Sequence, residues 1–505
     1  MRRCRVVVVG LAALLGVGTA AAREGAGSPP AAPAFPGAQG SGAWARGGRG
    51  GEVFEVTTLR DSGPGSLREC VEASGPRTCV FRVGGVIQVE RSMTVDHPFL
   101  TIAGQTAPGG VALAIRRAVS RPNTWILDVK THDVVVRYLR FWGDYVPGDR
   151  PDRGNGSYGV VLHDPASRVI VDHCDLLWFT GKAFAGWGNS FGDLTLQWSI
   201  VGENVSGGQG GQSTPILVSS STFDPDRVHG VDLHHNLIAS GDERNPLVCS
   251  DSARIVNNVI YNWRYFAVGV DNGGSADIIG NHWKPGPGPK SCIREVLVSR
   301  AARRGTLYLA NNRSDWGGPG ARCSTDFGRR VPASGHEPDG GWALLTGGSA
   351  RYQGSASGGD DPELTPLPAS FKRAPWAPLP SEGIPIRIDP VASLPSVLAA
   401  AGGSGASRRL DCVGGWVPAR DPTERRILQD LASGAGPVRT PRSAEEANRG
   451  PLPSLKPRAP CADADHDGIP DEWERAHGLD PRDPLDGRKM SRDGYTNLEH
   501  YLNGE

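Results

Sequence analysis

Short apolar segments of one shape recur along the middle of the chain, and this repetition constrains the fold more than any other feature. Each segment alternates apolar and other residues, continues with two polar or aromatic residues, and then reaches Asn or a small residue. The shortest steps between segment starts are 22 and 23 residues, and the longer steps indicate loops inserted at one corner. A fixed period with variable insertions is typical of a solenoid. The segments begin at Val134, Val169, Leu194, Val231, Ala253, Ala276 and Thr306.

We predict an all-β fold, a right-handed parallel β-helix, because no long amphipathic helix separates the segments. The main alternative, a β-sandwich, would place two-residue turns between neighbouring strands, whereas the connections here are much longer. Asn recurs at the segment ends, which suits tight corners, since Asn tolerates left-handed backbone and stacked amides hydrogen-bond from coil to coil. These residues are Asn236, Asn258, Asn281 and Asn311.

Composition changes along the chain divide it into five parts. Arg2, Arg3 and Arg5 precede a short apolar run that closes on alanines, the pattern of a secretory signal peptide. After the repeats, the chain becomes rich in Gly, Pro and Ser, with two helix-like patches at 391–401 and 422–431 that we expect to cap the open end of the solenoid. The predicted parts are 1–22 signal peptide, 34–334 β-helix, 335–434 loops and helical cap, 435–460 linker, and 461–505 a small C-terminal module.

Charge and cysteine content limit the partners and the compartment. The chain has 54 basic and 54 acidic residues, so no nucleic-acid partner is expected, and after the signal peptide no stretch approaches the roughly 20 apolar residues of a membrane span. Eight cysteines remain beyond the signal peptide, which permits disulfides in a secreted, extracellular protein. We predict the pairs Cys70–Cys79, Cys412–Cys461 and Cys292–Cys323, with Cys174 as a buried thiol.

The C-terminal module carries a calcium-loop pattern. Carboxylates fall at positions 1, 3, 5 and 9 of a twelve-residue loop, Gly468 stands at position 6, and a Glu at position 12 can chelate through both oxygens. This pattern predicts a Ca²⁺ site. The module resembles the dockerin-like or thrombospondin-like tails of secreted glycan-degrading enzymes, which implies a cohesin-like partner as one option. The predicted ligands are Asp463, Asp465, Asp467, the main chain of Ile469, Asp471 and Glu474.

Several motifs of the predicted β-helix together resemble bacterial pectate lyases. The opening coils contain Phe35-Pro36-Gly37-Ala38 and a Gly-Gln-Thr-Ala-Pro-Gly turn at 104–109, and the later coils contain Val171-Asp172-His173-Cys174 and Arg244-Asn245-Pro246. The resemblance covers about residues 34 to 320. It implies a monomeric polysaccharide lyase that cleaves polygalacturonate or pectin by β-elimination, with calcium bridging protein and substrate carboxylates.

The resemblance also implies roles for individual residues. Arg244 occupies the position of the catalytic base, although a guanidinium normally stays protonated. The implied substrate-binding residues are His235, Asn245, Trp178 and Trp263, and the implied active-site calcium ligands are Asp172 and Asp175.

The chain departs from the family where the metal is expected. The family places an Asp-Glu pair after the Asp-His-Cys strand, and this chain has Thr180-Gly181-Lys182. We therefore predict that Lys182 replaces the metal, with its ammonium group against Asp172 or Asp175. Two other functions remain open. One is a non-catalytic glycan-binding β-helix, and the other is a β-helix glycoside hydrolase, which needs paired acids such as these two aspartates.

Overall fold

The computed structural model describes residues 32–115, 124–143, 156–205, 213–264, 266–287, 294–299, 305–315, 344–346, 364–366, 383–437 and 452–505. The predicted signal peptide, most of the predicted linker and the predicted Cys292–Cys323 pair lie outside these ranges. Within them, no helix is both long and apolar enough to cross a membrane.

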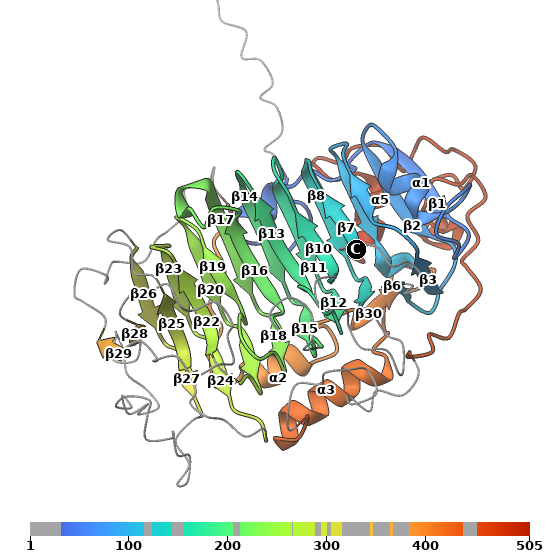
Figure 1. Cartoon of the computed structure of the whole chain (residues 1–505). Helices are drawn as coiled ribbons and strands as arrows, with labels where there is room; N and C mark the ends of the chain where they lie inside the picture. The colour runs from blue at the N-terminus through green and yellow to red at the C-terminus, as the bar shows by residue number, and fades with distance from the viewer. Residues whose placement is uncertain are drawn as a thin grey trace, which may run out of the picture.

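Three long sheets run side by side along the molecule (Figure 1). Sheet 1 contains β1 (Glu52–Val56), β2 (Arg77–Phe81), β5 (Leu100–Ala103), β8 (His132–Arg137), β11 (Ser167–Asp172), β14 (Phe191–Gln197), β17 (Val228–His234), β20 (Ala253–Val256), β23 (Ala276–Ile279) and β26 (Leu307–Ala310). Sheet 2 contains β3 (Gly85–Val89), β6 (Val111–Ile115), β9 (Arg140–Trp142), β12 (Asp175–Leu177), β15 (Ile200–Gly202), β18 (Leu237–Ala239), β21 (Val259–Tyr261), β24 (His282–Lys284) and β27 (Arg313–Ser314). Sheet 3 contains β4 (Met93–Val95), β7 (Thr124–Val129), β10 (Ser157–Leu162), β13 (Phe184–Gly188), β16 (Ile216–Ser220), β19 (Leu247–Cys249), β22 (Phe266–Asp271), β25 (Arg294–Ser299), β28 (Leu344–Thr346) and β29 (Leu364–Pro366).

Each coil contributes one strand to each sheet, and strands of successive coils pair in parallel. Strand β8 pairs with β11, β9 with β12, and β10 with β13. Only β28 and β29, among these described strands, pair antiparallel. This arrangement confirms the predicted parallel β-helix.

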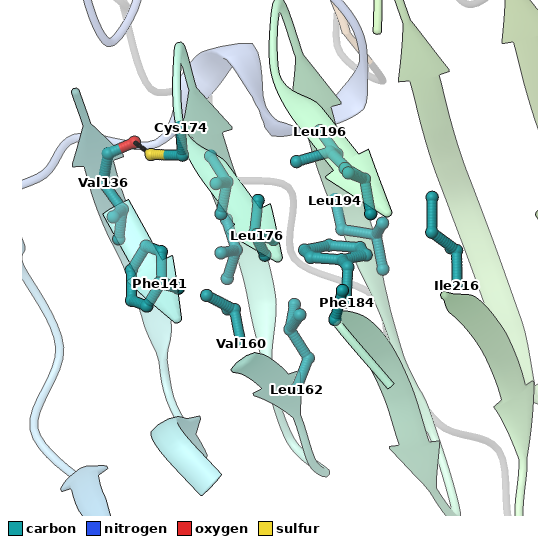
Figure 2. Close-up of a cluster of buried hydrophobic side chains, with 14 of the residues drawn as sticks. Val136, Phe141, Val160, Leu162, Cys174, Leu176, Phe184, Leu194, Leu196 and Ile216 are labelled. Atoms are coloured by element: carbon teal, nitrogen blue, oxygen red, sulfur yellow. Dashed lines mark hydrogen bonds between the residues drawn. The ribbon is translucent and has the colours of Figure 1, made fainter. Parts of the chain in front are cut away.

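The interior of the solenoid is filled by alternate side chains of all three sheets. Val160 and Leu162 point inward toward Phe184 and Ile216 of the following coils (Figure 2). Cys174 is a buried free thiol whose Sγ lies 3.9 Å from the main-chain oxygen of Val136, as predicted for a core cysteine. Because strand residues alternate between the two faces, the neighbours of these core residues point outward and are available for a site.

A ladder of asparagine side chains lines one corner of the later coils. The amide Nδ2 of Asn236 donates to Oδ1 of Asn258 at 3.0 Å, and Asn258 donates to Asn281 in the same way. The ladder then ends on Asn312, at 3.0 Å from Asn281, and not on the predicted Asn311. The left-handed position lies one residue earlier in each coil, at His235, Asn257 and Asn311 (φ of 54°, 51° and 54°). The sequence pattern assigned the amide ladder and the left-handed corner to the same residue, whereas the structure places them on two neighbouring residues.

Helices α2 (Leu394–Ala399) and α3 (Pro422–Ser433) form where helix-like patches are predicted, but they do not cap the end of the solenoid. Leu394 and Ile427 belong to a cluster with Leu177 and Ile200 of sheet 2, so both helices cover the outer face of that sheet (Figure 1). Helix α3 begins with a capping box at Asp421. Between the two helices in sequence, the chain forms an antiparallel pair of strands, β30 (Arg408–Leu410) and β31 (Trp416–Pro418).

The C-terminal module packs against the outer face of the first coils of sheet 1 (Figure 1), while α1 (Leu67–Glu72) packs on the solenoid core. Its helices are α4 (Asp471–His477) and α5 (Asn497–Asn503). Arg49 forms a 2.8 Å ion pair with Glu499, and Gln105 donates to the main-chain oxygen of Leu502 at 3.2 Å. The disulfide Cys412–Cys461 ties the module to the β30–β31 segment, and Cys70–Cys79 closes the α1 turn. Both disulfides confirm the predicted pairs.

Candidate functional site

A cavity of about 330 Å³ lies on the outer face of sheet 3. Its walls are aromatic side chains from successive coils. Trp125 of β7 packs against Tyr158 of β10, with ring centroids 6.3 Å apart, and Trp187 of β13 packs edge-on against Phe223 at 5.6 Å. Two cations, Lys182 and Arg244, line the same cavity. Flat apolar walls with a few convergent charged groups are what a site for an acidic sugar requires.

The turn that carries Lys182 is fixed by hydrogen bonds to the coils on both sides. Thr180 Oγ1 accepts from the main-chain N–H of Ser157 at 2.9 Å, and the N–H of Gly181 donates to the main-chain oxygen of Ser157 at 2.9 Å. On the other side, the N–H of Ala183 donates to the oxygen of Pro215 at 2.8 Å. A Cβ at position 181 would lie 2.7 Å from the Tyr158 ring, so only Gly allows the ring to approach. Lys182 therefore sits on a rigid support.

Lys182 is 6 % exposed, and no hydrogen bond or ion pair joins its ammonium group to a described residue. Burial, followed by the nearby Arg244, lowers the pKa of Lys182 to about 7, while Glu243 acts in the opposite direction. A lysine that is neutral for part of the time at physiological pH is unusual, and such groups are concentrated in functional sites.

Arg244 reaches the cavity from a strained turn just before β19. Its backbone is left-handed (φ of 60°), and its carbonyl accepts from the N–H of Ile216 at 3.1 Å. Its Nε lies 3.3 Å from Oε1 of the buried Glu243, and about a quarter of the side chain (28 %) remains exposed. The same left-handed conformation recurs at other corners of the solenoid, so it is the lining of the cavity that brings Arg244 into the site. The predicted catalytic pair, Lys182 and Arg244, is thus brought together.

The predicted active-site calcium ligands lie elsewhere. Asp172 is fully buried, with its carboxylate against Arg137 at 2.9 Å, Gln197 at 2.8 Å and His173 at 2.8 Å. Burial raises its pKa, but His173 and Arg137 outweigh burial and hold the pKa well below its usual range. Asp172 is a satisfied structural carboxylate, and it does not line the Lys182 cavity.

Asp175 is equally buried, under the segment that precedes α3. Its partner is Arg140, with 3.5 Å between Nε and Oδ2, and the same guanidinium also contacts Asp421 at 3.1 Å and Glu424 at 2.9 Å. Burial and Glu424 raise the pKa of Asp175 despite Arg140. The prediction that Lys182 contacts Asp172 or Asp175 is therefore corrected, because neither carboxylate lines the cavity.

The predicted substrate-binding residues are structural as well. His235 is 1 % exposed and stacks on Trp198 with ring centroids 4.4 Å apart, and Asn245 is also 1 % exposed and donates to the oxygen of Phe266 at 3.3 Å. Trp178 donates to Glu203 at 3.0 Å beneath α3, and Trp263 lies in the solenoid core. None of these four lines the cavity, whose aromatic walls are instead Trp125, Tyr158, Trp187 and Phe223.

A second cluster of functional groups lies in the C-terminal module. Asp463, Asp465 and Asp467 place carboxylate oxygens within 4.8 Å of one another, and so do Asp467, Glu474 and Asp486. Both carboxylate oxygens of the fully buried Glu474 lack a hydrogen-bond partner. Burial, then the neighbouring carboxylates, raise the pKa of Glu474 to about 8 and burial raises that of Asp467 to about 7. Such a group of buried, unpartnered oxygens fits a hard cation.

The cluster differs from the predicted ligand set at one position. The carboxylate oxygens of Asp471 already have partners within the module. One accepts from the N–H of Ala464 at 2.8 Å, and the other accepts from Arg475 at 2.9 Å. Asp486, twelve residues after Glu474, joins the cluster in its place. Gly487 permits this approach, because a Cβ there would lie 2.1 Å from Oδ2 of Asp467. The loop pattern alone gave no signal for a ligand so far along the chain.

Comparison with known proteins identifies the family. A probable pectate lyase C of Neosartorya fischeri is 30% identical over 475 residues, which cover 93% of this chain and 93% of that protein. The chain belongs to the pectate lyase family. A probable pectate lyase C of Aspergillus fumigatus is also 30% identical, over 480 residues and 93% of each chain. No family model matches. Among solved structures, the cedar pollen allergen jun a 1 gives a TM-score of 0.49 at 14% identity and covers 72% of this chain and 92% of that one.

Pectate lyases as a family use calcium between enzyme and substrate, so we compared the cavity with the needs of that ion. Ca²⁺ takes six to eight oxygen ligands, with carboxylates foremost. The described residues that line the cavity include no Asp or Glu. Glu243, the carboxylate beside Arg244, is buried against that guanidinium. The described part of this site therefore does not fit a protein-held calcium ion.

Proposed function

We propose that this pectate lyase homologue cleaves a polyuronate, polygalacturonate or pectin, by β-elimination in the cavity over sheet 3. The observation that carries the proposal is that Lys182 and Arg244, far apart in sequence, line one cavity whose walls are aromatic. Arg244 binds and polarises the uronate carboxylate, which makes the neighbouring ring proton more acidic. The aromatic faces stack on the sugar rings.

The same arrangement supports cleavage without calcium in the active site. Lys182 stands where the family places acidic metal ligands, so the protein offers a basic side chain at that point in place of a carboxylate. A hydrolase needs two carboxyl groups on opposite sides of the bond, and the described lining contains none. A non-catalytic glycan-binding role remains the alternative, since a cationic aromatic cavity also suits binding alone.

The test is the ultraviolet absorbance of unsaturated uronides released from polygalacturonate and from methylated pectin. Each polymer is incubated with calcium or with chelator, below the unfolding temperature measured in chelator. We expect absorbance to rise in both conditions, to be lost in Arg244→Ala, and to persist in the matched control Arg425→Ala, whose exposed side chain lies on α3 over sheet 2. Binding of both polymers without any rise would leave only the glycan-binding role.

We further propose that the C-terminal module binds Ca²⁺ through Asp463, Asp465, Asp467, Glu474 and Asp486, together with the main-chain oxygen of Ile469. The unpartnered oxygens of buried Glu474 support this site. The function is structural, because the module packs on the first coils far from the cavity. Saturation at 100 times the Kd would add about 2.7 kcal/mol to the free energy of unfolding.

Calorimetric titration with Ca²⁺ tests this second proposal. Glu474→Gln and Asp486→Asn should each abolish or weaken binding at least tenfold, and the neighbouring exposed Asp483→Asn should not. Full binding by Asp486→Asn together with loss in Asp471→Asn would restore the ligand set expected from the loop pattern. Secretion, a monomeric state and a cohesin-like partner of the module remain predictions from the sequence.

A further inference from the structure

The two cations of the cavity differ in their partners. Arg244 is paired with Glu243 at 3.3 Å, whereas the ammonium group of Lys182 has no hydrogen bond or ion pair to a described residue. We propose that Lys182 is the Brønsted base of the elimination and that Arg244 holds the carboxylate of the sugar residue being cleaved. This inference rests on the proposed lyase function and reassigns the base that the family resemblance implies.

The chemistry of the two side chains favours this division of roles. A guanidinium stays protonated in proteins, and its planar fork matches a carboxylate. A lysine shifts its pKa readily when it is buried, which is how lysine serves as a general base. Lys182 is 6 % exposed, and it lines the cavity from a turn that hydrogen bonds to the preceding coil hold in place.

The charged and titratable groups around Lys182 act in both directions. Arg244 lowers its pKa and Glu243 raises it, with burial the largest effect. Tyr158 and His163 also line the cavity, and burial raises the pKa of the Tyr158 hydroxyl. His163 is the rival base, because its Nδ1 faces the buried Asp128 at 2.5 Å, which fixes the ring and leaves Nε2 to accept a proton. The His163→Gln variant therefore belongs to the test of the assignment.

The step balances without any further reactant. The free-base nitrogen of Lys182 takes the proton from the ring carbon that carries the carboxylate. The electron pair of that C–H bond forms the new double bond to the neighbouring ring carbon, and the bond from that carbon to the glycosidic oxygen breaks. The leaving oxygen takes a proton from the new ammonium group or from water. Arg244 stabilises the negative charge that develops on the carboxylate.

The experiment measures kcat and kcat/KM against pH for the wild type, Lys182→Met, Lys182→Arg, Arg244→Lys and His163→Gln, with exposed Lys456→Met as the matched control. We expect the wild-type kcat/KM to rise with pH through about 7, the pKa of Lys182 in the free enzyme. Lys182→Met and Lys182→Arg should both lose that rise and about 10²–10⁴-fold in kcat, the usual range for a general base. Arg244→Lys should keep the rise and increase KM.

Amine rescue separates a lost base from a damaged fold. Ethylamine added to Lys182→Met should restore activity in proportion to its free-base concentration, while the thermal unfolding midpoint stays near that of the wild type. The assignment is overturned if Lys182→Met keeps the rise near pH 7 with kcat within tenfold, or if His163→Gln alone removes the rise. Absence of any unsaturated product from the wild type overturns the proposed function and this inference together.

Discussion

Nδ2 of Asn258 lies 3.0 Å from Oδ1 of Asn281, and Oδ1 of Asn258 in turn accepts from Asn236. Each amide thus serves the coil before it and the coil after it, inside a fully buried corner.

Asn258→Ala should therefore cost about 1–3 kcal/mol for each buried partner left unsatisfied. The orphaned groups are the main-chain N–H of Asn236 and one N–H of its side-chain amide, since the other still donates to the main-chain oxygen of Leu196. Asn311→Gly is the matched control, because that residue is exposed and left-handed, and Gly accepts this backbone without strain. Urea unfolding followed by tryptophan fluorescence measures both variants. Equal stability of the two would show that the ladder contributes nothing.

Arg140→Met should destabilise the protein by about 3–5 kcal/mol, because three buried carboxylates lose their shared cation. These are Asp175, Asp421 and Glu424. Helix α3 should detach first, which limited proteolysis detects as early cleavage in that region. The exposed Arg425→Met on the same helix should change the free energy of unfolding by no more than about 0.5 kcal/mol.

His235 should make the protein less stable in mild acid. Burial lowers its pKa to about 4, although Asp389 opposes the shift. Because the folded pKa lies below the unfolded value of about 6.5, the folded state resists protonation. The stability is full above pH 6.5 and is lost as the pH falls from 6.5 toward 4, by roughly 3 kcal/mol. His235→Gln should flatten this part of the stability profile, and exposed His97→Gln should leave it unchanged.

Gly181→Ala should damage both the fold and the cavity. The new Cβ would lie 2.7 Å from the Ser157 oxygen and from the Tyr158 ring, so one of them must move, at a cost of about 1–3 kcal/mol. The displacement should also lower kcat/KM, since Lys182 is the next residue. In Gly402→Ala the nearest atom, at 3.1 Å, belongs to the end of the Arg408 side chain, which can swing away. Unchanged activity in Gly181→Ala would mean that the turn tolerates a shift.

The sequence predicted the β-helix because its signal is periodic. Apolar residues at every second position of a strand fill the core, and the recurrence of that strand in each coil is visible without any structure, as in Val169 and Leu194. Asp463, Asp465, Asp467 and Glu474 of the C-terminal loop converge as their spacing predicts, since a loop closes on itself over a few residues, whereas Asp471 does not join them. Asp486 escaped prediction because its approach depends on the fold of the module.

The position of the active site around the solenoid could not be predicted from spacing alone. Asp172 ends a strand of sheet 1, Asp175 begins a strand of sheet 2, and Lys182 precedes a strand of sheet 3. Between Asp172 and Lys182 the chain therefore passes two corners of the solenoid, so residues that are close in sequence lie on different sheets. Trp125 and Tyr158 were missed for the converse reason: they lie on successive coils of one sheet, but 33 positions apart in the chain.

A solenoid is nearly a one-dimensional object, in which each coil touches only its neighbours and the terminal coils fray most easily. The contacts of Glu499 with Arg49, and of Asp463 with Arg82, join the last part of this chain to the first coils. The first coils therefore have a neighbour on their outer face that is distant from them in sequence. The N-terminal coils would otherwise be among the first to unfold. Their resistance to fraying therefore depends on residues of the C-terminal module.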